Sequence, residues 1–178
     1  MNKIAKIGLD ELDKEIFNIS DDAADAEGIM VRSASLHDME FNPELKAIVR
    51  CGAGVNNIPT DKCAEQGIVV FNTPGANANG VKELTIASLL LASRKITDGI
   101  NWANTLETDV AKQVEKGKSA FGGCEIQGKT LGVIGLGAIG GLVANAASAL
   151  GMNVIGYDPF ISVDAAWNVS KKVKKADT

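Results

Sequence analysis

The most informative residues are three glycines with a fixed spacing, Gly135, Gly137 and Gly140. They follow the apolar stretch 131–134 and open a stretch rich in small residues, 138–150. In a strand–turn–helix of this kind, the first glycine makes the tight turn and the second lets the backbone approach a pyrophosphate, while the third lets helix and strand pack closely. Glycines also cluster in many turns that bind nothing. Their place between an expected strand and an expected helix nevertheless favours a phosphate-binding loop, with the phosphates at the helix N-terminus.

An acidic residue stands where such a loop would need one. Asp158 ends a second apolar stretch, 152–157, eighteen residues after Gly140. A carboxylate at this place can accept hydrogen bonds from both adenosine ribose hydroxyls, and it would repel a 2′-phosphate, so NAD is favoured over NADP. Because Pro159 follows, a turn-forming aspartate is the alternative interpretation.

Two arginines lie near the ends of expected strands. Arg32 belongs to the stretch 28–33 and Arg50 to the stretch 45–52. The carboxyl ends of strands in an open parallel sheet face the ligand crevice, and guanidinium groups bind phosphate through paired hydrogen bonds. Together the arginines suit a small phosphorylated acid, although a surface ion pair is the alternative for each one alone.

A glycine-containing segment, 51–57, follows Arg50 directly. Gly52 and Gly54 can bring backbone N–H groups against a carboxylate. An ordinary tight loop is the alternative for this segment.

The sequence offers little else that could act as a general base or a metal ligand. His37 is the only histidine and lies in an expected surface loop, so we expect an exposed polar residue and not a catalytic one. Cys51, Cys63 and Cys124 are odd in number, far apart and without a second Cys or His nearby, which argues against a disulfide framework and against zinc. We therefore expect reduced thiols and no metal site.

The elements that position these residues alternate between short apolar stretches and helical ones. Expected helices include 61–66, 138–150 and a long amphipathic one at 81–104, and the lysine-rich tail 171–175 is expected to be a solvated helix end. Most of the expected strands lack polar and apolar alternation, as strands covered on both faces do, which predicts a parallel α/β sheet. These strands are residues 4–9, 28–33, 45–52, 67–72, 130–137 and 152–158.

Composition narrows the classes of protein that remain. A hydrophobic content of 46% predicts a globular chain with a real core. A net charge of −4 and a pI near 5.1 give no general attraction to nucleic acid or anionic lipid. The segment 1–8 alternates Lys and Ile and does not resemble a signal peptide, and no run reaches the roughly 20 apolar residues that a membrane span needs. We expect a soluble, cytoplasmic protein.

The order of these segments resembles the D-2-hydroxyacid dehydrogenases, and the 3-phosphoglycerate dehydrogenases most of all. The resemblance covers nearly the whole chain, and the combination of segments is far more specific than any one of them. The segments that carry it are residues 31–33, 50–57, 72–74, 83–85, 128–132, 135–140 and 156–159.

The resemblance implies a domain organisation and a set of site residues. It implies a flavodoxin-like parallel-sheet substrate domain at 1–97, an interdomain helix end and arm at 98–128, and the start of a truncated Rossmann NAD-binding domain at 129–178, with the active site between the domains. The implied substrate-binding residues are Arg32, Ser33, Arg50, Gly52, Ala53, Gly54 and Val55, and the implied NAD-binding residues are Ala53, Gly135, Gly137, Ala138, Ile139, Gly140 and Asp158. Many relatives carry Thr in place of Ala53 and Arg or His in place of Ala138, so weaker NAD binding is expected.

The activity implied by the resemblance is oxidation of 3-phosphoglycerate to 3-phosphohydroxypyruvate with NAD, the entry step of serine biosynthesis. The family's catalytic Arg, Glu and His lie in segments beyond Thr178, so this stretch by itself is expected to be inactive. Alternatives are a reductase of an unphosphorylated acid such as glyoxylate or hydroxypyruvate, and, from another class, an NAD(H)-sensing corepressor. The expected partner is a small phosphorylated hydroxy acid, and the full-length protein is expected to form a homodimer or larger homo-oligomer.

Overall fold

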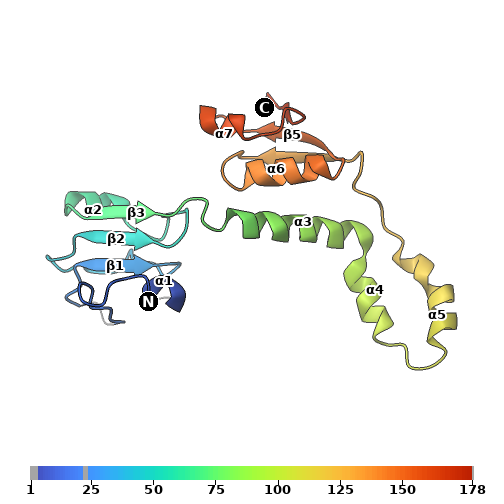
Figure 1. The fold of residues 1–178 in the computed structure, drawn as a ribbon, viewed down its shortest axis with the longest axis horizontal. Coiled ribbons are helices and arrows are strands. Elements are labelled where there is room, and N and C mark those ends of the chain that lie inside the picture. Colours follow the sequence, from blue (N-terminus) through green and yellow to red (C-terminus); the bar gives the residue numbers. More distant parts are fainter. Residues whose placement is uncertain (1–3, 22–23, 178) are drawn as a thin grey trace. The chain divides into compact units, whose positions relative to one another are not determined.

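The computed structural model describes residues 4–21 and 24–177, and it shows an α/β chain that divides into two compact units, Met1–Asn77 and Ala78–Thr178 (Figure 1). Each unit contains its own parallel three-stranded sheet. The parallel α/β architecture expected from the apolar stretches is therefore confirmed. Among the described residues, no helix is both long and apolar enough to cross a membrane.

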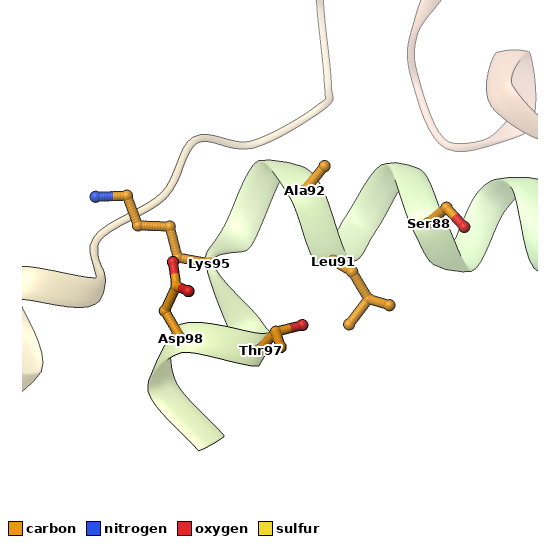
Figure 2. A pocket seen from close by; sticks show the side chains of 6 residues that line it. All are labelled: Ser88, Leu91, Ala92, Lys95, Thr97 and Asp98. Atoms are coloured by element: carbon orange, nitrogen blue, oxygen red, sulfur yellow. The ribbon is translucent and has the colours of Figure 1, made fainter. Parts of the chain in front are cut away.

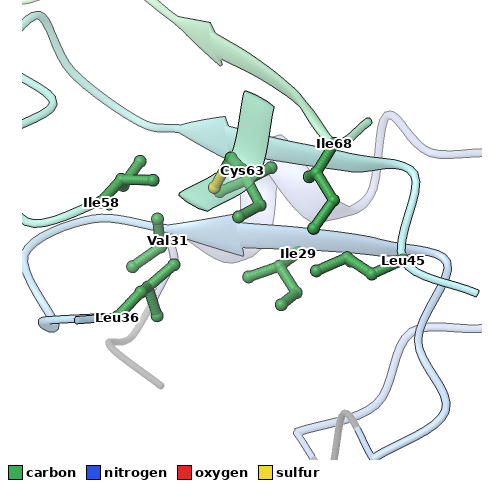
Figure 3. Packing of buried hydrophobic residues seen from close by; sticks show 8 residues of the cluster. Ile29, Val31, Leu36, Leu45, Ile58, Cys63 and Ile68 are labelled. Atoms are coloured by element: carbon green, nitrogen blue, oxygen red, sulfur yellow. The ribbon is translucent and has the colours of Figure 1, made fainter. Parts of the chain in front are cut away.

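The first unit is built on strands β1 (Gly28–Val31), β2 (Ala47–Arg50) and β3 (Val69–Asn72), in the order β1-β2-β3. Helix α2 (Thr60–Glu65) provides the crossover between β2 and β3. The core gathers apolar side chains from β1, β2, α2 and the loops (Figure 3), namely Ile29, Val31, Leu36, Leu45, Ile48, Ile58, Cys63 and Ile68.

The second unit begins with helices α3 (Ala78–Arg94), α4 (Ile96–Ala103) and α5 (Val110–Gly117), followed by the short helix η1 (Lys118–Phe121). Next come β4 (Thr130–Ile134), α6 (Gly140–Ala149), β5 (Asn153–Tyr157), α7 (Val163–Trp167) and β6 (Lys174–Lys175). The sheet order is β4-β5-β6, and helix α3 lies against α6 (Figure 1). Ala144, Ala147, Met152 and Val154 form the buried centre, against which Ile86 and Leu89 of α3 pack.

The segment between α4 and β4 folds back on the end of α3. Trp102 and Phe121 have ring centroids 5.0 Å apart, and the Cys124 N–H donates to the Ser93 carbonyl at 2.9 Å. Gly123 allows this approach because a Cβ there would collide with the Ser93 carbonyl oxygen. The segment is therefore attached to α4 through an aromatic contact and to α3 through a backbone hydrogen bond.

The compact units divide at Asn77, because α3 packs against α6. The sequence instead places this helix at the end of a substrate domain that spans 1–97. That domain assignment, with an arm at 98–128 and a dinucleotide domain from 129, stays a prediction about the whole protein.

Five of the six expected strands are present, at β1 to β5. The prediction of a strand at residues 4–9 was wrong. Residues Lys6–Leu9 form the one-turn helix α1, in which Ile7 is 78% exposed. The Leu9 N–H bonds to the Ala5 carbonyl at 3.3 Å and no strand pairs with the segment, so a local turn satisfies its backbone. Residues 1–3, which precede this segment, lie outside the described residues.

Two other expectations need correction. The predicted single helix 81–104 is broken at Lys95, whose φ of 51° and ψ of 35° are left-handed, so α3 and α4 are separate helices. The tail at 171–175 is not a helix end: β6 pairs in parallel with Ile155 and Gly156 of β5. This pairing depends on the open edge of β5, which local propensity does not encode.

Candidate functional site

The glycine loop joins the end of β4 to the start of α6, and its three glycines have the geometries that their expected roles require. Gly135 has a φ of +86°, which favours glycine and makes the tight turn. A Cβ on Gly140 would collide with the carbonyl oxygen of Gly135, so only glycine allows helix and loop to come this close. Gly137 is exposed and has open space where a Cβ would stand, so a ligand can approach its backbone.

The N-terminus of α6 follows the glycine loop directly, and the Gly141 N–H there donates to the Gly137 carbonyl at 3.0 Å. Ile139 is the N-cap residue, and no side chain caps the helix. Because the first amides of a helix lack intrahelical acceptors, this end favours an anion. Ala138 and Ile139 are both exposed beside it, but neither brings a charge.

Asp158 follows β5 and binds the backbone of the glycine loop. Its Oδ2 accepts from the Leu136 N–H at 2.8 Å, and its Oδ1 accepts from the Phe160 N–H at 2.9 Å. The second bond is the turn that the alternative interpretation predicted. A carboxylate has about four lone-pair sites, so both oxygens can still accept from a ribose.

Arg50 and Arg32 lie at the carboxyl ends of two neighbouring strands in the first sheet. Val31, Arg50 and Asn72 are aligned across β1, β2 and β3, and Arg32 is the next residue after Val31. Arg32 is exposed, while Arg50 is half-buried. Within residues 4–21 and 24–177, neither arginine forms an ion pair with a carboxylate, so the surface ion pairs that the alternative requires are not found there.

The guanidinium of Arg50 lies across Gly52. A Cβ on Gly52 would overlap Nη1 of Arg50, and the φ of +148° at Gly52 also favours glycine. Nη1 donates to the Cys51 carbonyl at a long 3.4 Å, and the buried Nε has no hydrogen-bond partner. The group is thus held in place while much of its hydrogen-bonding capacity stays unused.

Asn72 and Thr73 hold the loop that carries Gly52 to Val55, a contribution that the sequence analysis missed. The Asn72 amide donates to the Ala53 carbonyl at 2.8 Å, and the Thr73 N–H donates to the Gly52 carbonyl at 2.9 Å. Ala53 and Gly54 are exposed beside these contacts. The sequence analysis named residues 72–74 among the segments of the family resemblance but gave Asn72 no role in this loop.

Ser33 follows Arg32 directly and is exposed. It therefore lies at the same end of the first sheet as the two arginines.

His37 and the cysteines do not form a second site. His37 is exposed, and its Nε2 is 2.9 Å from the Asn56 carbonyl oxygen. The three cysteines are free, and burial raises the pKa of the Cys63 thiol. In the described part of the chain, no three His, Cys, Asp or Glu side chains are grouped as metal ligands.

Two surface hollows lie in the second unit, away from the predicted residues. One, of about 390 Å³, lies at the bend between α3 and α4 (Figure 2) and includes Leu91 and Thr97, with Lys95 extending away from both. The other, of about 510 Å³, lies between α3 and α6. Neither is lined by a residue of the glycine loop or by an arginine, so neither is the predicted site.

Comparison with known proteins places the chain among enzymes. Residues 6–175 match the model of the D-isomer specific 2-hydroxyacid dehydrogenase catalytic domain. D-3-phosphoglycerate dehydrogenase of Methanocaldococcus jannaschii is 43% identical over 145 residues, which cover 80% of this chain and 26% of the relative. The same enzyme of Archaeoglobus fulgidus is 40% identical over 158 residues, which cover 85% of this chain and 28% of the relative. The chain thus spans about a quarter of the length of the curated relatives it matches.

A solved structure shares the fold. The crystal structure of cofactor (NAD⁺)-bound 3-phosphoglycerate dehydrogenase from Entamoeba histolytica has a TM-score of 0.57 at 34% identity, covering 83% of this chain and 42% of that one. The fold and the sequence therefore point to the same group of proteins.

Proposed function

The chain belongs to the D-isomer specific 2-hydroxyacid dehydrogenase family, and from this premise we propose that the whole protein oxidises 3-phosphoglycerate to 3-phosphohydroxypyruvate with NAD. The names of the curated relatives support this substrate. The reaction would place the protein at the entry to serine biosynthesis. Its partner is a small hydroxy acid, and we propose that it acts as a homodimer or larger homo-oligomer.

The glycine loop and Asp158 fit NAD as the cofactor. Gly137 is open to a pyrophosphate, α6 presents uncapped amides, and Asp158 has lone pairs left for the ribose hydroxyls. When bound, NAD supplies the hydride acceptor. Ala138 and Ala53 add neither a charge nor a hydroxyl, so we expect NAD to bind more weakly here than where those side chains are present.

The Arg50 guanidinium is the observation that carries the choice of a phosphorylated substrate. It lies across Gly52 with a buried, unpartnered Nε and without a carboxylate partner among the described residues. A phosphate could form paired hydrogen bonds with the Nη groups of this half-buried guanidinium. Arg32 supplies a second positive charge at the same sheet edge, and the backbone of residues 52–55 would receive the carboxylate.

The hydroxyl proton must be removed by a base that we do not assign to residues 1–178. His37 is exposed and its Nε2 contacts a backbone carbonyl, so it lacks the orienting carboxylate that a general base of this kind uses. We propose that this 178-residue chain binds ligands without turning them over.

An Arg50→Ala substitution in the whole protein tests the substrate. A charged hydrogen bond contributes about 1.5 to 3 kcal/mol, so kcat/KM for 3-phosphoglycerate should fall roughly tenfold or more. The kcat/KM for unphosphorylated glycerate should fall much less. The matched control is Arg94→Ala on α3. Equal losses on both acids would contradict the phosphate role and favour a reductase of an unphosphorylated acid.

A further inference from the structure

Gly156 lies in the middle of a strand, and its backbone conformation does not require a glycine. It lies in β5, paired with Val133 of β4, and its φ is not positive. A strand-interior glycine is unfavourable because it loses more conformational freedom on folding than other residues and packs no side chain. Its presence therefore indicates that something else needs the space.

The side chain of Leu136, in the glycine loop, occupies that space. A Cβ on Gly156 would stand 2.8 Å from Cδ1, 3.1 Å from Cδ2 and 3.3 Å from Cγ of Leu136. Leu136 also packs on the buried cluster of Ala144, Ala147, Met152 and Val154. It thus points inward from the loop, while the next residue, Gly137, faces open space.

The backbone on either side of this side chain is bonded to the end of the same strand. The Gly135 N–H donates to the Tyr157 carbonyl at 2.8 Å, and the Leu136 N–H donates to Oδ2 of Asp158 at 2.8 Å. The loop is therefore attached to β5 by two hydrogen bonds and by the Leu136 side chain packed over Gly156. A displaced Leu136 would move the donor of the second bond and the adjoining Gly137.

We propose that Gly156 is a positioning residue for the dinucleotide loop, because the space it leaves lets Leu136 hold Gly137 and the carboxylate of Asp158 in their binding geometry. This inference rests on the proposed function, since it assigns the loop a dinucleotide to position. It adds a fourth glycine, outside the spaced triplet, to the residues on which cofactor binding depends.

A double-mutant cycle in the whole protein tests the pairing. The variants are Gly156→Ala, Leu136→Ala and the double substitution, and the matched control is Gly132→Ala in β4, where a new Cβ meets nothing within 4 Å. Hydrogen exchange by mass spectrometry, followed on the peptide that contains Leu136 and Gly137, reports opening of the loop without ligand, and calorimetry gives the dissociation constant for added NAD. Thermal midpoints separate a loss of binding from a loss of stability.

Gly156→Ala should speed Leu136 amide exchange and weaken NAD binding, each by about tenfold, whereas Gly132→Ala should change neither. In the Leu136→Ala background, Gly156→Ala should change amide exchange and NAD binding by less than about twofold, because the overlapping atoms are gone. If Gly156→Ala does not fold, a double variant that folds and binds NAD supports the pairing, and a double variant that also fails overturns it.

Different results would overturn the positioning role of Gly156 and the cofactor site. Equal costs of Gly156→Ala in both backgrounds, or unchanged NAD binding by that variant, would overturn the positioning role. An unsubstituted whole protein in which NAD slows exchange of no peptide that covers Gly135, Gly137 or Gly140 would overturn the proposed cofactor site itself.

Discussion

Asp158 combines two contacts that substitution can separate. Its charge would repel a 2′-phosphate, while its two oxygens hold the N–H groups of Leu136 and Phe160. In the whole protein, Asp158→Asn removes the charge and keeps one acceptor, so the preference for NAD over NADP should narrow with a modest loss of affinity. Asp158→Ala should also narrow the preference for NAD, and it should weaken the binding of both cofactors, because the Leu136 N–H loses its acceptor. Dissociation constants for the two cofactors measure this, and an unchanged preference in both variants would remove Asp158 from cofactor selection.

The cysteines differ in environment strongly enough to predict their reactivity. Cys63 is fully buried, and desolvation raises its pKa above the usual 9.0 although the charge of Lys62 opposes the shift. Since the thiolate is the nucleophile, iodoacetamide should label exposed Cys124 first and leave Cys63 unmodified until the chain unfolds. Peptide mapping by mass spectrometry, with a urea-unfolded control, follows each site. Labelling of Cys63 as fast as Cys124 would contradict its burial.

The same pKa shift has a consequence for stability. The native state holds the Cys63 proton more tightly than the unfolded chain, whose thiol has the usual pKa of 9.0. The contribution of the protonated Cys63 thiol to the free energy of unfolding is therefore fully present below pH 9.0, and it is lost as the pH rises through the raised folded-state pKa.

The break between α3 and α4 is an element boundary made by a residue poorly suited to it. Lys95 is left-handed at φ 51°, a conformation that costs a non-glycine residue roughly 1 kcal/mol. Lys95→Gly should therefore raise the free energy of unfolding by up to about 1 kcal/mol, although it removes the 3.4 Å bond from Nζ to the Ala120 carbonyl. Lys112→Gly, inside α5, should lower it by about the same amount. Urea unfolding measures both, and a loss of stability in Lys95→Gly would show that the left-handed backbone is not strained.

The helix break also shows where sequence reasoning ends at the scale of elements. The strands β1 to β5 were predicted because covered strands are continuous apolar runs, a signal that each segment carries by itself. Lys95 carries no glycine or asparagine signal, α1 was mistaken for a strand, and β6 depends on a distant edge. The candidate site likewise has some residues that local sequence predicts and some contacts that it does not.

The glycine spacing and the strand-end arginines were visible in the chain because the chemistry fixes those residue types. The packing of Leu136 on Gly156 and the bond from Asn72 to Ala53 join residues 20 and 19 positions apart. Such contacts depend on how two elements meet in space, which no local pattern records.

For the whole molecule, the two units differ in how well each is covered. The first has a core cluster of eight buried residues, whereas the corresponding cluster in the second has four. Large apolar side chains are exposed in both units, and those of the second include Ile134 at 88%, Phe160 at 92% and Trp167 at 79%. Because burial of apolar surface is the main stabilising contribution, the second unit should be the less stable one.

The isolated 178-residue chain should therefore lose protection unevenly under hydrogen exchange. Backbone amides after about residue 128 should exchange fast, while those of β1 and β2 should stay protected, because opening free energies follow the local core. The dinucleotide loop lies in the less stable unit, so part of the NAD binding energy must order it, and we expect a dissociation constant no tighter than about millimolar and no dehydrogenase activity. Exchange measured by mass spectrometry and a calorimetric titration test this on one sample. Micromolar NAD binding together with strong protection of β4 and β5 would show that four buried residues and the cover from α3 are enough to hold the loop in its binding geometry.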